Sequence, residues 1–479
     1  LPSQRPSKYC RTFESEAVES MIRTISERMV NRDLARLFEN AFPNTLDTTV
    51  RWHVNGESEE AGDTDSSAQW RGPQTFIVTG DINAEWLRDS TNQLAHYHRL
   101  AKGDQDIYNL ILGAINTQAE FVIESPYCNA FQPPPPSRIP PTDNAQDDIV
   151  HPVYEPARVF ECKYELDSLA HFLALANDFH KHTGSTKFLT PRWYAALEAL
   201  LTVVDEQSRP TFDEVSGAPQ KQTYRFQRKT IVGTETLSLD GVGNPLNSAA
   251  GLIRSAFRPS DDATILGYHI PSNAMLSVEL ARTAAIVAPA SAELSSTLST
   301  LSKSISDAIW EHAVFNHSTH GRVFAYEIDG YGSSIFMDDA NIPSLLALPH
   351  LGFCSASDPV YKNTRALVLS RQSNPYYFEG PEFQGIGGPH VGLRNPWPMS
   401  LLIQALTSDS DEEISDLLTR VKYASPLGLL RESVNMFEIE SYTRSWFAWA
   451  NSLFAYTILD VAERKPHLIF GSDDKGRKE

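Results

Sequence analysis

Several acidic residues in this sequence stand beside arginine or aromatic residues, as acids do in sites that transfer protons. The pair Asp261-Asp262 ends the motif FRPSDD, and Glu432 follows Arg431 ahead of a segment rich in aromatic residues. A guanidinium such as that of Arg258 can hold one carboxylate by bidentate hydrogen bonding while the other carboxylate faces a cavity. Each acid also has a structural interpretation, as a helix cap for the Asp pair and as an ion-pair partner for Glu432.

A second group of residues has the chemistry of a carbohydrate-binding site. Trp86, Arg88 and Asp89 lie within one turn of a predicted helix. Charged planar groups bond to the vicinal hydroxyls of a sugar, and an indole face packs against the C–H side of its ring. The same three residues are equally compatible with a surface ion pair beside a core tryptophan.

Another acidic pair, Asp338-Asp339, precedes a predicted helix together with Asn341. Such side chains cap free backbone N–H groups at a helix start, and capping explains them as well as ligand binding does. We retain Asp339 as a candidate sugar contact. A calcium site is a less favoured alternative, because these side chains supply the oxygen ligands that Ca²⁺ takes.

The segment 385–390, with the sequence GIGGPH, is superficially similar to a phosphate-binding loop. It lacks the preceding strand, the GK[ST] ending and the downstream ribose-binding acid that define such loops. We interpret it as backbone that passes close to a ligand, with His390 as a polar contact and Trp397 as a platform for the ligand.

These motifs are dispersed over the chain, yet each lies at the boundary of a predicted helix. In a helical toroid the helix ends converge on one mouth, which would gather the motifs into one pocket. Glycoside hydrolysis needs two carboxyl groups there, one that protonates the leaving oxygen and one that activates water or attacks carbon. The sequence has no nucleotide, flavin or haem signature, no HExxH motif and no clear metal cluster, so we expect neither a cofactor nor a metal.

Apolar residues at helical spacing recur from end to end and predict about a dozen helices. The predicted helical ranges are 14–30, 85–101, 104–123, 161–182, 191–204, 272–287, 291–312, 342–349, 359–370, 397–407, 411–423 and 442–464. The clearest strand signals are those of 74–79, 222–228 and 322–328. Successive helices separated by loops rich in Gly, Pro, Asp and Asn predict an all-α toroid with short β elements in its loops.

The longest irregular stretch, 126–157, contains the proline run 133–136. Because helical patterning resumes unchanged beyond it, we interpret this stretch as a loop at the rim of one domain that spans 1–479, in preference to a domain linker. The charged tail at 471–479 is expected to be frayed.

The net charge of −19 opposes binding to nucleic acid or to an anionic membrane surface. No apolar run reaches the length of a membrane-spanning helix, about 18 residues. A sequon at Asn316 and the missing initiator methionine favour a secreted or secretory-pathway protein, with a trimmed sequence as the alternative. Up to two disulfides are available, although the last two cysteines also suit buried thiols; the cysteines are Cys10, Cys128, Cys162 and Cys354.

Taken in order, these motifs resemble those of glycoside hydrolase family 125, the metal-independent exo-α-1,6-mannosidases of bacteria and fungi. The resemblance covers about residues 15 to 464 and rests on TGDI (79–82), WLRDS (86–90), KYELDSL (163–169), FRPSDD (257–262), IPSN (270–273), MDD (337–339), NIPSLL (341–346), NPY (374–376) and Glu432-Ser433. It implies an (α/α)₆ barrel and hydrolysis with inversion, with Asp261 as general acid and Glu432 as general base. By the same matching, the substrate contacts would be Arg88, Asp89, Asp262 and Asp339.

The resemblance further implies a mannose-containing glycan as partner, from which a terminal non-reducing α-1,6-linked mannose is released. Two features depart from the family pattern: Arg431 stands where a His commonly precedes the base, and the Pro-rich loop is longer than in bacterial members. The first bears on the surroundings of the base and the second on the leaving-group side. The alternatives are a catalytically inactive glycan-binding toroid, a lyase and a metal-dependent mannosidase. The oligomeric state is not determined by the sequence, and we favour a monomer.

Overall fold

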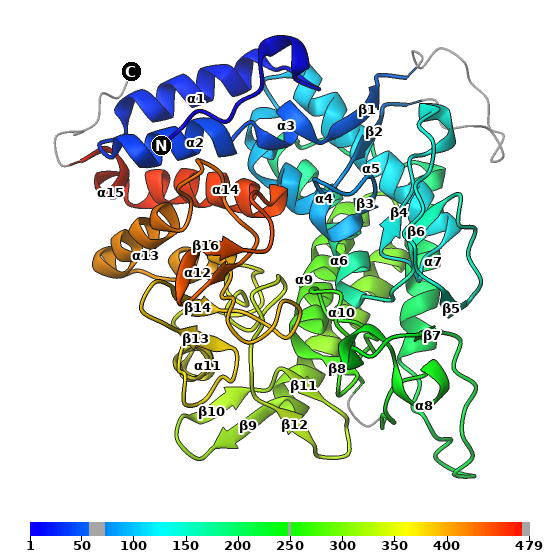
Figure 1. The fold of residues 1–479 in the computed structure, drawn as a ribbon. Helices are drawn as coiled ribbons and strands as arrows, with labels where there is room; N and C mark the ends of the chain where they lie inside the picture. The colour runs from blue at the N-terminus through cyan, green and yellow to red at the C-terminus, as the bar shows by residue number, and fades with distance from the viewer. Residues whose placement is uncertain (57–71, 248–250, 472–479) are drawn as a thin grey trace.

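The structure, a computed structural model, describes residues 1–56, 72–247 and 251–471, and within these ranges it is mostly helical. The central helices are α4 (Leu87–Leu94), α6 (Leu166–Thr183), α9 (Ile270–Val287), α12 (Pro398–Leu406) and α14 (Ala448–Arg464). Helix α6 packs between α4 and α9, and α14 packs between α4 and α12 (Figure 1). Neighbouring central helices therefore come from distant parts of the sequence.

A second set of helices packs outside the first. Helix α2 (Arg32–Ala41) contacts α14, α5 (Gln105–Glu124) contacts α6, α10 (Ala292–His312) contacts α9, and α13 (Asp411–Tyr423) contacts α12. The first and last parts of the chain thus lie side by side, as Figure 1 shows for α1, α2 and α14. The remaining α-helices are α1 (Glu16–Arg28), α3 (Asn44–Thr48), α7 (Pro191–Gln207), α8 (Ser238–Gly241), α11 (Pro359–Val368) and α15 (Pro466–Phe470).

The local sequence explains where several helices begin and end. The carboxylate of Asp104 accepts the backbone N–H groups of Asp106 and Ile107 and so caps α5. The hydroxyl of Ser291 caps α10 in the same manner. Helix α6 ends at Gly184, whose φ of 71° lies in the left-handed region that glycine adopts without a steric penalty. Capping residues therefore fix the helix boundaries that the apolar periodicity leaves open.

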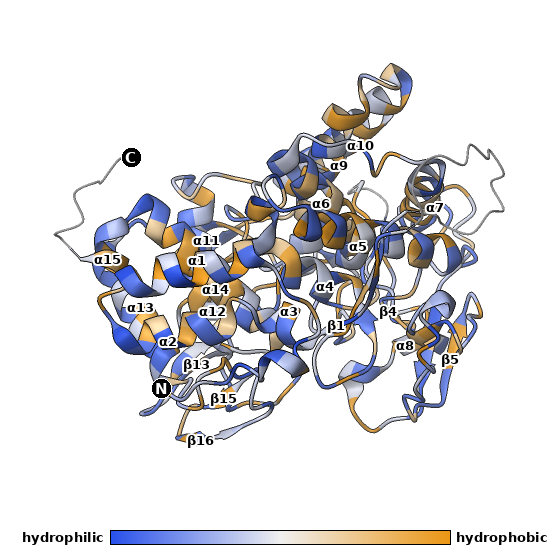
Figure 2. Ribbon diagram, turned by 90° about the horizontal axis from the view of Figure 1, so that it is seen from above, coloured by the Kyte–Doolittle hydropathy of each residue, from blue (hydrophilic) through white to orange (hydrophobic). Residues whose placement is uncertain are grey.

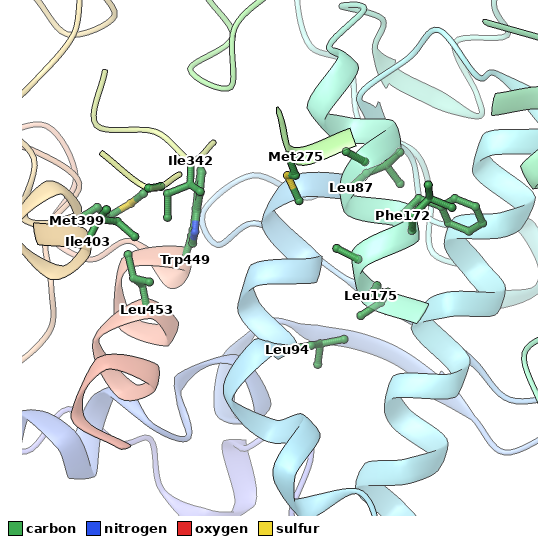
Figure 3. Close-up of a cluster of buried hydrophobic side chains, with 14 of the residues drawn as sticks. Leu87, Leu94, Phe172, Leu175, Met275, Ile342, Met399, Ile403, Trp449 and Leu453 are labelled. Atoms are coloured by element: carbon green, nitrogen blue, oxygen red, sulfur yellow. The ribbon is translucent and has the colours of Figure 1, made fainter. Parts of the chain in front are cut away.

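The central helices share one apolar core. Figure 3 shows side chains of this core, including Leu87 of α4, Leu175 of α6, Met275 of α9, Met399 of α12 and Leu453 of α14, and all of them are buried. Figure 2 shows hydrophobic residues concentrated on α12 and α14 and hydrophilic residues on the outer helices α2 and α13. Burial of apolar surface on these facing helices is the main favourable contribution to folding.

Short antiparallel strands precede two central helices. One sheet combines β3 (Glu85–Trp86), β4 (Ala130–Phe131) and β6 (Val159–Glu161), and another combines β8 (Tyr268–His269), β11 (Glu327–Ile328) and β12 (Ser334–Ile335). Strand β3 leads directly into α4 and β8 into α9. The remaining pairs are β1 (Val50–Val54) with β2 (Gln74–Ile77), β5 (Asp148–His151) with β7 (Arg225–Arg228), β9 (Val314–His317) with β10 (Gly321–Phe324), β13 (Tyr377–Glu379) with β14 (Gln384–Ile386), and β15 (Val434–Asn435) with β16 (Glu438–Tyr442).

Four helix predictions are wrong in part, including 85–101, which begins with strand β3. Residues 342–349 form turns, because the Asp338 carboxylate accepts the N–H groups of Leu345 and Leu346 and closes a single turn there. The start of the range 161–182 is extended, since β6 pairs with β4 and α6 begins only at Leu166. The range 442–464 likewise begins with the end of β16. In each case a contact from outside the segment overrides its helical pattern.

The Pro-rich stretch 126–157 is anchored to the body of the protein. Gln132 and Thr142 bond across it, and the Asn144 amide donates to the backbone carbonyl of Phe160. Its strand β5 pairs with β7, where the Arg228 guanidinium binds the Asp148 carboxylate at 2.7 Å. The expected irregular loop therefore contains strand pairing. The tail predicted at 471–479 lies outside the described residues, apart from Gly471.

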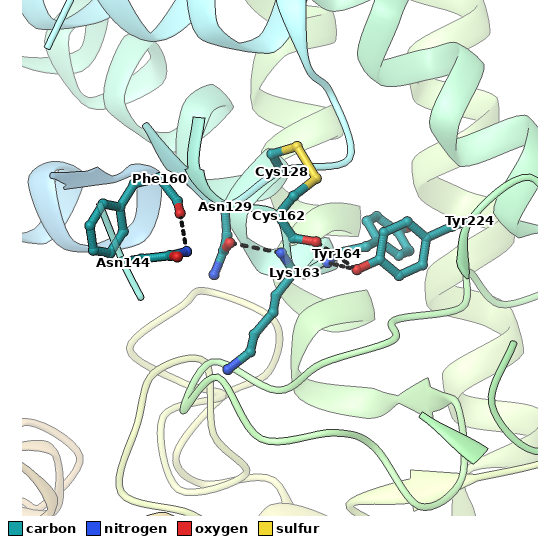
Figure 4. The surroundings of a disulfide bond; sticks show 8 residues. All are labelled: Cys128, Asn129, Asn144, Phe160, Cys162, Lys163, Tyr164 and Tyr224. Carbon is teal, nitrogen blue, oxygen red and sulfur yellow. Dashed lines mark hydrogen bonds between the residues drawn. A yellow bond between two sulfur atoms is a disulfide. The ribbon is translucent and has the colours of Figure 1, made fainter. Parts of the chain in front are cut away.

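One disulfide, between Cys128 and Cys162, joins the start of this stretch to the segment that leads into α6 (Figure 4). Cys10 and Cys354 are free thiols. The sequon residue Asn316 is exposed on β9. None of the helices within the described ranges has the length and hydropathy needed to span a bilayer.

Candidate active site

A cavity of about 500 Å³ lies where the chain enters α4 and α14. Its wall combines the start of α4, the turn that carries Asp261, and the segments around Glu432 and Arg444. It is lined by Thr79, Asp81, Ile82, Trp86, Arg88, Asp89, Pro259, Ser260, Asp261, Asn341, His390, Trp397, Glu432, Arg444, Phe447 and Trp449. The two acids singled out in the sequence therefore share one cavity.

The Glu432 carboxylate is held by two residues that follow it on the same hairpin. Arg444 Nη1 donates to Oε1, and Thr443 Oγ1 donates to Oε2 at 2.6 Å. Arg444 Nε also binds Asp81 Oδ2 at 3.1 Å, across the cavity wall. Strands β15 and β16 bring Glu432 and these partners together, because they form a hairpin between them. Arg444 was not among the predicted site residues.

Arg431, which directly precedes Glu432, does not contact the carboxylate of that residue. Its Nη1 donates to the carbonyl of Ile439 at 2.5 Å, and its guanidinium lies 4.0 Å from the centre of the Tyr442 ring. The side chain is fully buried within the β15–β16 hairpin. In this protein Arg431 packs the hairpin, and Arg444 supplies the cation at the carboxylate.

Asp261 occupies a tight turn. Its N–H bonds the carbonyl of Arg258 at 2.9 Å, and the N–H of Arg258 bonds the carbonyl of Asp262 at 2.8 Å. Its φ of 68° is in the left-handed region, which Asp tolerates better than most residues other than glycine. The turn directs the Asp261 side chain to the cavity, where it remains 22% exposed.

Asp261 shares its hydrogen-bond donors with Glu165. Arg88 Nη2 and Asn129 Nδ2 each lie 3.3 Å from Asp261 Oδ1. The same two side chains bind Glu165, with Arg88 Nη1 at 2.7 Å and Asn129 Nδ2 at 3.1 Å. Ser168 Oγ donates to Glu165 Oε2 at 2.9 Å. Glu165 is fully buried behind the cavity wall, and the sequence had quoted it only as part of the motif KYELDSL.

The ionisation of Asp261 differs from what its assignment as an acid led us to expect. Burial raises the pKa of Asp261, but the Arg88 charge and a hydrogen bond with Glu165 outweigh burial and bring the pKa below its ordinary value. Burial and the Asp261 charge raise the pKa of Glu165 well above its ordinary value. The neighbours of Asp261 thus hold it ionised in the free site, and the proton resides on its buried partner.

Arg88 stands at the centre of a cluster of carboxylates. Its guanidinium nitrogens lie 3.2 Å from Asp89, 2.7 Å from Glu165, 3.8 Å from Asp167 and 3.3 Å from Asp261. Burial raises the pKa of Asp89 to about 6, and that of Asp167 to about 7. One cation therefore faces four acids, and some of these acids retain protons near neutral pH.

Three predicted site residues, Arg258, Asp262 and Asp339, do not line the cavity. Arg258 is buried, and its Nε donates to Glu327 at 2.6 Å, so it holds the β8–β11 region in place and does not grip either Asp of the FRPSDD motif. Asp262 lies behind His390, with 3.4 Å between Oδ1 and Nδ1. The prediction that Arg258 holds one of the adjacent carboxylates is therefore corrected, because Arg258 binds Glu327 and supports the site from outside the cavity.

His390 and Asp339 place the glycine-rich segment against the cavity. Although burial disfavours the charged imidazole, the ion pair with Asp262 raises the pKa of His390. Asp339 Oδ1 accepts the N–H and side-chain amide of Asn341, which lines the cavity. A Cβ at Gly388 would lie 2.5 Å from Asp339 Oδ2. The close backbone approach predicted for this segment is thus to Asp339.

Several polar atoms of the cavity wall have no hydrogen-bond partner within the described part of the protein. The atoms themselves are buried, and an unpaired buried donor or acceptor is costly unless a ligand or water satisfies it. These atoms are Thr79 Oγ1, Trp86 Nε1, Arg88 Nε, Asp89 Oδ2, Trp397 Nε1 and Trp449 Nε1. A ligand with many hydroxyl groups and apolar C–H faces satisfies such a wall.

The two acids of the second pair, Asp338 and Asp339, have different structural roles. Asp338 caps the turn at Leu345 and Leu346, as the capping interpretation predicted, so backbone donors occupy both of its oxygens. Across residues 1–56, 72–247 and 251–471, no group of three or more His, Cys, Asp or Glu side chains is arranged to hold a metal ion.

Sequence reasoning missed the roles of Glu165, Asn129 and Arg444 in surrounding the two acids. Asn129 follows Cys128, and Lys163 follows Cys162, so the disulfide holds these two residues next to each other (Figure 4). Asn129 in turn binds Glu165. Asn129 Oδ1 also accepts the N–H of Lys163 at 3.0 Å. Knowledge of the Cys128–Cys162 pairing would have indicated this contact, but the pairing cannot be deduced from the spacing of the cysteines.

Comparison with known proteins agrees with this geometry. Residues 31–459 match the model of a family described as metal-independent α-mannosidase, glycoside hydrolase family 125. A protein of Schizosaccharomyces pombe, named meiotically up-regulated gene 157 protein, is 54% identical over 471 residues, which are 98% of this chain and 90% of that protein.

Solved structures show the same relationship. A Streptococcus pneumoniae protein, described as one of a family of widely distributed metal-independent α-mannosidases and solved in a non-productive complex with α-1,6-mannobiose, is 32% identical, with a TM-score of 0.81; the match covers 95% of this chain and 100% of that one. A bacterial glucoamylase with acarbose shares the fold at 12% identity and a TM-score of 0.54, over 95% of this chain and 57% of that one. This chain belongs to glycoside hydrolase family 125, the metal-independent α-mannosidases.

Proposed function

We propose that this protein is an exo-acting α-1,6-mannosidase that releases the terminal non-reducing mannose of a glycan by direct, inverting hydrolysis. The observation that carries this proposal is the cavity in which Asp261 and Glu432 meet among unpartnered polar atoms and indole rings. The α-1,6 linkage is supported by the mannobiose bound to the S. pneumoniae relative. The substrate is accordingly a mannose-containing oligosaccharide or glycan.

The fold of this enzyme, we infer, is an (α/α)₆ barrel formed by one domain. The central helices α4, α6, α9, α12 and α14 support it, because each packs on its neighbours and on an outer helix. The turns at 342–349 take the place of the sixth inner helix, and Ile342 lies beside Met399 and Trp449 in the core (Figure 3). Packing of α14 on both α2 and α4 closes the ring.

In the reaction, Glu432 draws a proton from the water molecule that attacks the anomeric carbon. The ion pair with Arg444 and the bond from Thr443 fix the position of its carboxylate. Asp261 delivers a proton to the glycosidic oxygen as the bond to the leaving sugar breaks. Direct displacement requires room for a water molecule between the two carboxyl groups. It inverts the anomeric centre, so the product has the opposite anomeric configuration to the substrate.

The other residues of the wall hold the terminal mannose. Asp89 Oδ2 accepts a sugar hydroxyl, since it is buried and its partner within the described residues is the ion pair with Arg88 at 3.2 Å, which lacks hydrogen-bond geometry. The indole N–H groups of Trp86 and Trp397 donate to sugar oxygens, and His390, paired with Asp262, contributes a positively charged donor. Asp339 acts indirectly by holding Asn341 at the cavity.

The test is proton NMR of the sugar released from α-1,6-mannobiose in the presence of EDTA. We expect free mannose that appears first as the β-anomer. Asp261→Asn and Glu432→Gln should each lower kcat about 10²-fold or more, the usual contribution of a positioned acid or base, with an unchanged melting temperature. Binding of mannobiose without cleavage would instead identify a glycan-binding protein, and an unsaturated product would identify a lyase.

A further inference from the structure

We infer that Glu165 is the proton store of the general acid: it carries, between turnovers, the proton that Asp261 delivers to the glycosidic oxygen. The inference rests on the proposed function and deepens it, because it assigns a positioning residue that never touches the substrate. Its structural basis is the pair of donors, Arg88 and Asn129, that bridge both carboxyl groups.

The two carboxyl groups are close enough to share one proton. Arg88 reaches Glu165 at 2.7 Å and Asp261 at 3.3 Å with its two terminal nitrogens, and the Asn129 amide nitrogen reaches the two acids at 3.1 Å and 3.3 Å. Two carboxylates held side by side repel each other, so that one of them keeps its proton. The donors therefore hold the acids in one unit that carries a single proton.

Burial determines which carboxyl group holds the proton in the free site. The side chain of Glu165 has no exposed surface, whereas that of Asp261 is 22% exposed at the cavity. A charge is less costly on the more exposed group. Asp261 therefore carries the negative charge and stays in contact with solvent, while Glu165 keeps the proton behind the wall.

The surrounding charges reinforce this division. Arg88 faces both groups, and its single charge is shared among four carboxylates. Lys163, which extends toward Asp261 from the disulfide side, and His390 favour the ionised form of Asp261. The charged and titratable groups around the pair are thus Arg88 and Asp89 from α4, Lys163 and Asp167 from the Glu165 segment, and His390.

The proton balance of the step is simple. First, the O–H bond of Glu165 breaks as an O–H bond forms on Asp261. The O–H bond of Asp261 then breaks as its proton moves to the glycosidic oxygen, and the bond to the leaving sugar cleaves. Glu165 becomes a carboxylate that accepts bonds from Arg88, Asn129 and Ser168. After product release, a proton from solvent enters at Asp261 and returns to Glu165, while Glu432 gives to solvent the proton it took from water.

The experiment compares Glu165→Gln on two substrates. The glutamine keeps the size of the side chain and one acceptor oxygen but cannot release a proton. With α-1,6-mannobiose, whose leaving sugar must be protonated, we expect kcat to fall about 10²-fold. With 2,4-dinitrophenyl α-mannoside, whose leaving group departs as an anion, we expect a loss of less than about 3-fold, in the range of a weak general-acid requirement.

The pH profile gives a second measurement. In the wild type, the alkaline limb of kcat/KM on mannobiose reports loss of the proton shared by the pair. Without Glu165, only Asp261 can hold that proton, beside Arg88 and Lys163, and it loses the proton at lower pH. Glu165→Gln should therefore move the alkaline limb to lower pH. An unmoved limb, or an equal loss on both substrates, would overturn the inference in favour of a structural role.

Glu279→Gln is the matched control. Glu279 is also a buried carboxyl, bound by Asn177 at 2.7 Å and Arg282 at 2.9 Å, but it lines a separate cavity. Its replacement should leave the ratio of the two activities unchanged, and the dinitrophenyl substrate reports that each variant is folded. If Asp261→Asn shows the leaving-group dependence and Glu165→Gln does not, only the role of Glu165 fails. If Asp261→Asn instead retains full activity on mannobiose, the proposed function fails.

Discussion

Glu432 and Asp261 are each held by an arginine, but the two arginines have different origins. Arg444 reaches Glu432 from the residues that immediately follow the β15–β16 hairpin, whereas Arg88 reaches Asp261 from the start of α4. Arg444 binds Glu432 and Asp81, while Arg88 is divided among four acids. The base therefore shares its arginine with one other acid, whereas Asp261 shares its arginine with three.

This difference makes Arg444 a sharp test of how the base is positioned. Arg444→Met removes the charge-assisted bond to Glu432, so we expect kcat on mannobiose to fall about 10- to 100-fold, the equivalent of 1.5–3 kcal/mol for a hydrogen bond to a charged group. Arg444→Lys should recover part of this loss because it keeps the charge. Steady-state kinetics with each variant measures the effect.

Arg431→Met is the control for this change, because Arg431 adjoins Glu432 in sequence but packs on Tyr442 and Ile439. It should lower the melting temperature and leave kcat near the wild-type value. If the Arg431 variant lost more activity than the Arg444 variant, the assignment of the two arginines would be reversed.

For individual residues, the sequence predicts which side chains belong to the site better than it predicts which side chains they contact. Asp261, Glu432, Arg88 and Asp89 stand in motifs whose chemistry is visible in the sequence, and the cavity contains all four. Arg258 was expected to hold an adjacent acid, yet it binds Glu327 through the β8–β11 pairing. Partners that are distant along the chain depend on the fold, and a single sequence does not encode them locally.

Among the elements, the glycine-rich segment 385–390 is constrained by packing. Gly387 would bring a Cβ to 2.5 Å from the Phe378 ring, and Gly388 would bring one to 2.5 Å from the Asp339 carboxylate. Strand β14 ends at Ile386, so these glycines lie where the strand leaves the sheet and passes the cavity. Side chains have no room at this point.

Gly388→Ala should therefore disturb both the segment and the bond from Asp339 to Asn341. We expect the free energy of unfolding to fall by about 1–3 kcal/mol, the usual cost of overpacking, and KM for mannobiose to rise. Thermal denaturation and kinetics measure the two effects. Gly233→Ala, where no atom lies within 4 Å of the added Cβ, is the control and should change neither quantity.

The helices were largely predictable because their apolar periodicity is long, as in α5, α10 and α13, whose bounds lie within a residue of the prediction. The three predicted strand ranges are confirmed by β2, β7 and β10. The other strands were not predicted, because several contain only two residues, too few for an alternating pattern. Strand β3 is an example: Glu85 and Trp86 carry a helical pattern with α4, yet they pair with β4. Tertiary pairing decides such short elements.

For the whole molecule, buried acids couple stability to pH. Burial raises the pKa of five carboxyl groups to between about 6 and 8, namely Glu85, Asp89, Asp167, Glu279 and Asp338. Between about pH 4 and these values, each of these acids binds its proton more strongly in the folded protein than in the unfolded chain, whereas burial lowers the pKa of His96, His98 and His171 and acts in the opposite direction. The contribution of the five acids to the free energy of unfolding therefore decreases as the pH rises through this window.

We accordingly expect the melting temperature of Asp338→Asn, relative to that of the wild type, to rise between pH 5 and pH 8, because the wild type alone must ionise a buried carboxyl over this range. Differential scanning calorimetry of both proteins at several pH values measures the difference. A difference that stayed constant between pH 5 and pH 8 would contradict the raised pKa of Asp338.

The packing of segments that are distant along the chain also bears on how the enzyme is made. Arg88, Asp261 and Glu432 come from the early, middle and late parts of the chain, and α14 must pack on α2 and α4 before the wall that joins them is complete. Contacts between such distant segments slow folding, because a long loop must close first. During synthesis on the ribosome the chain therefore has no assembled cavity, and hydrolysis of nearby glycans begins only after the last long helix has left the ribosome and docked.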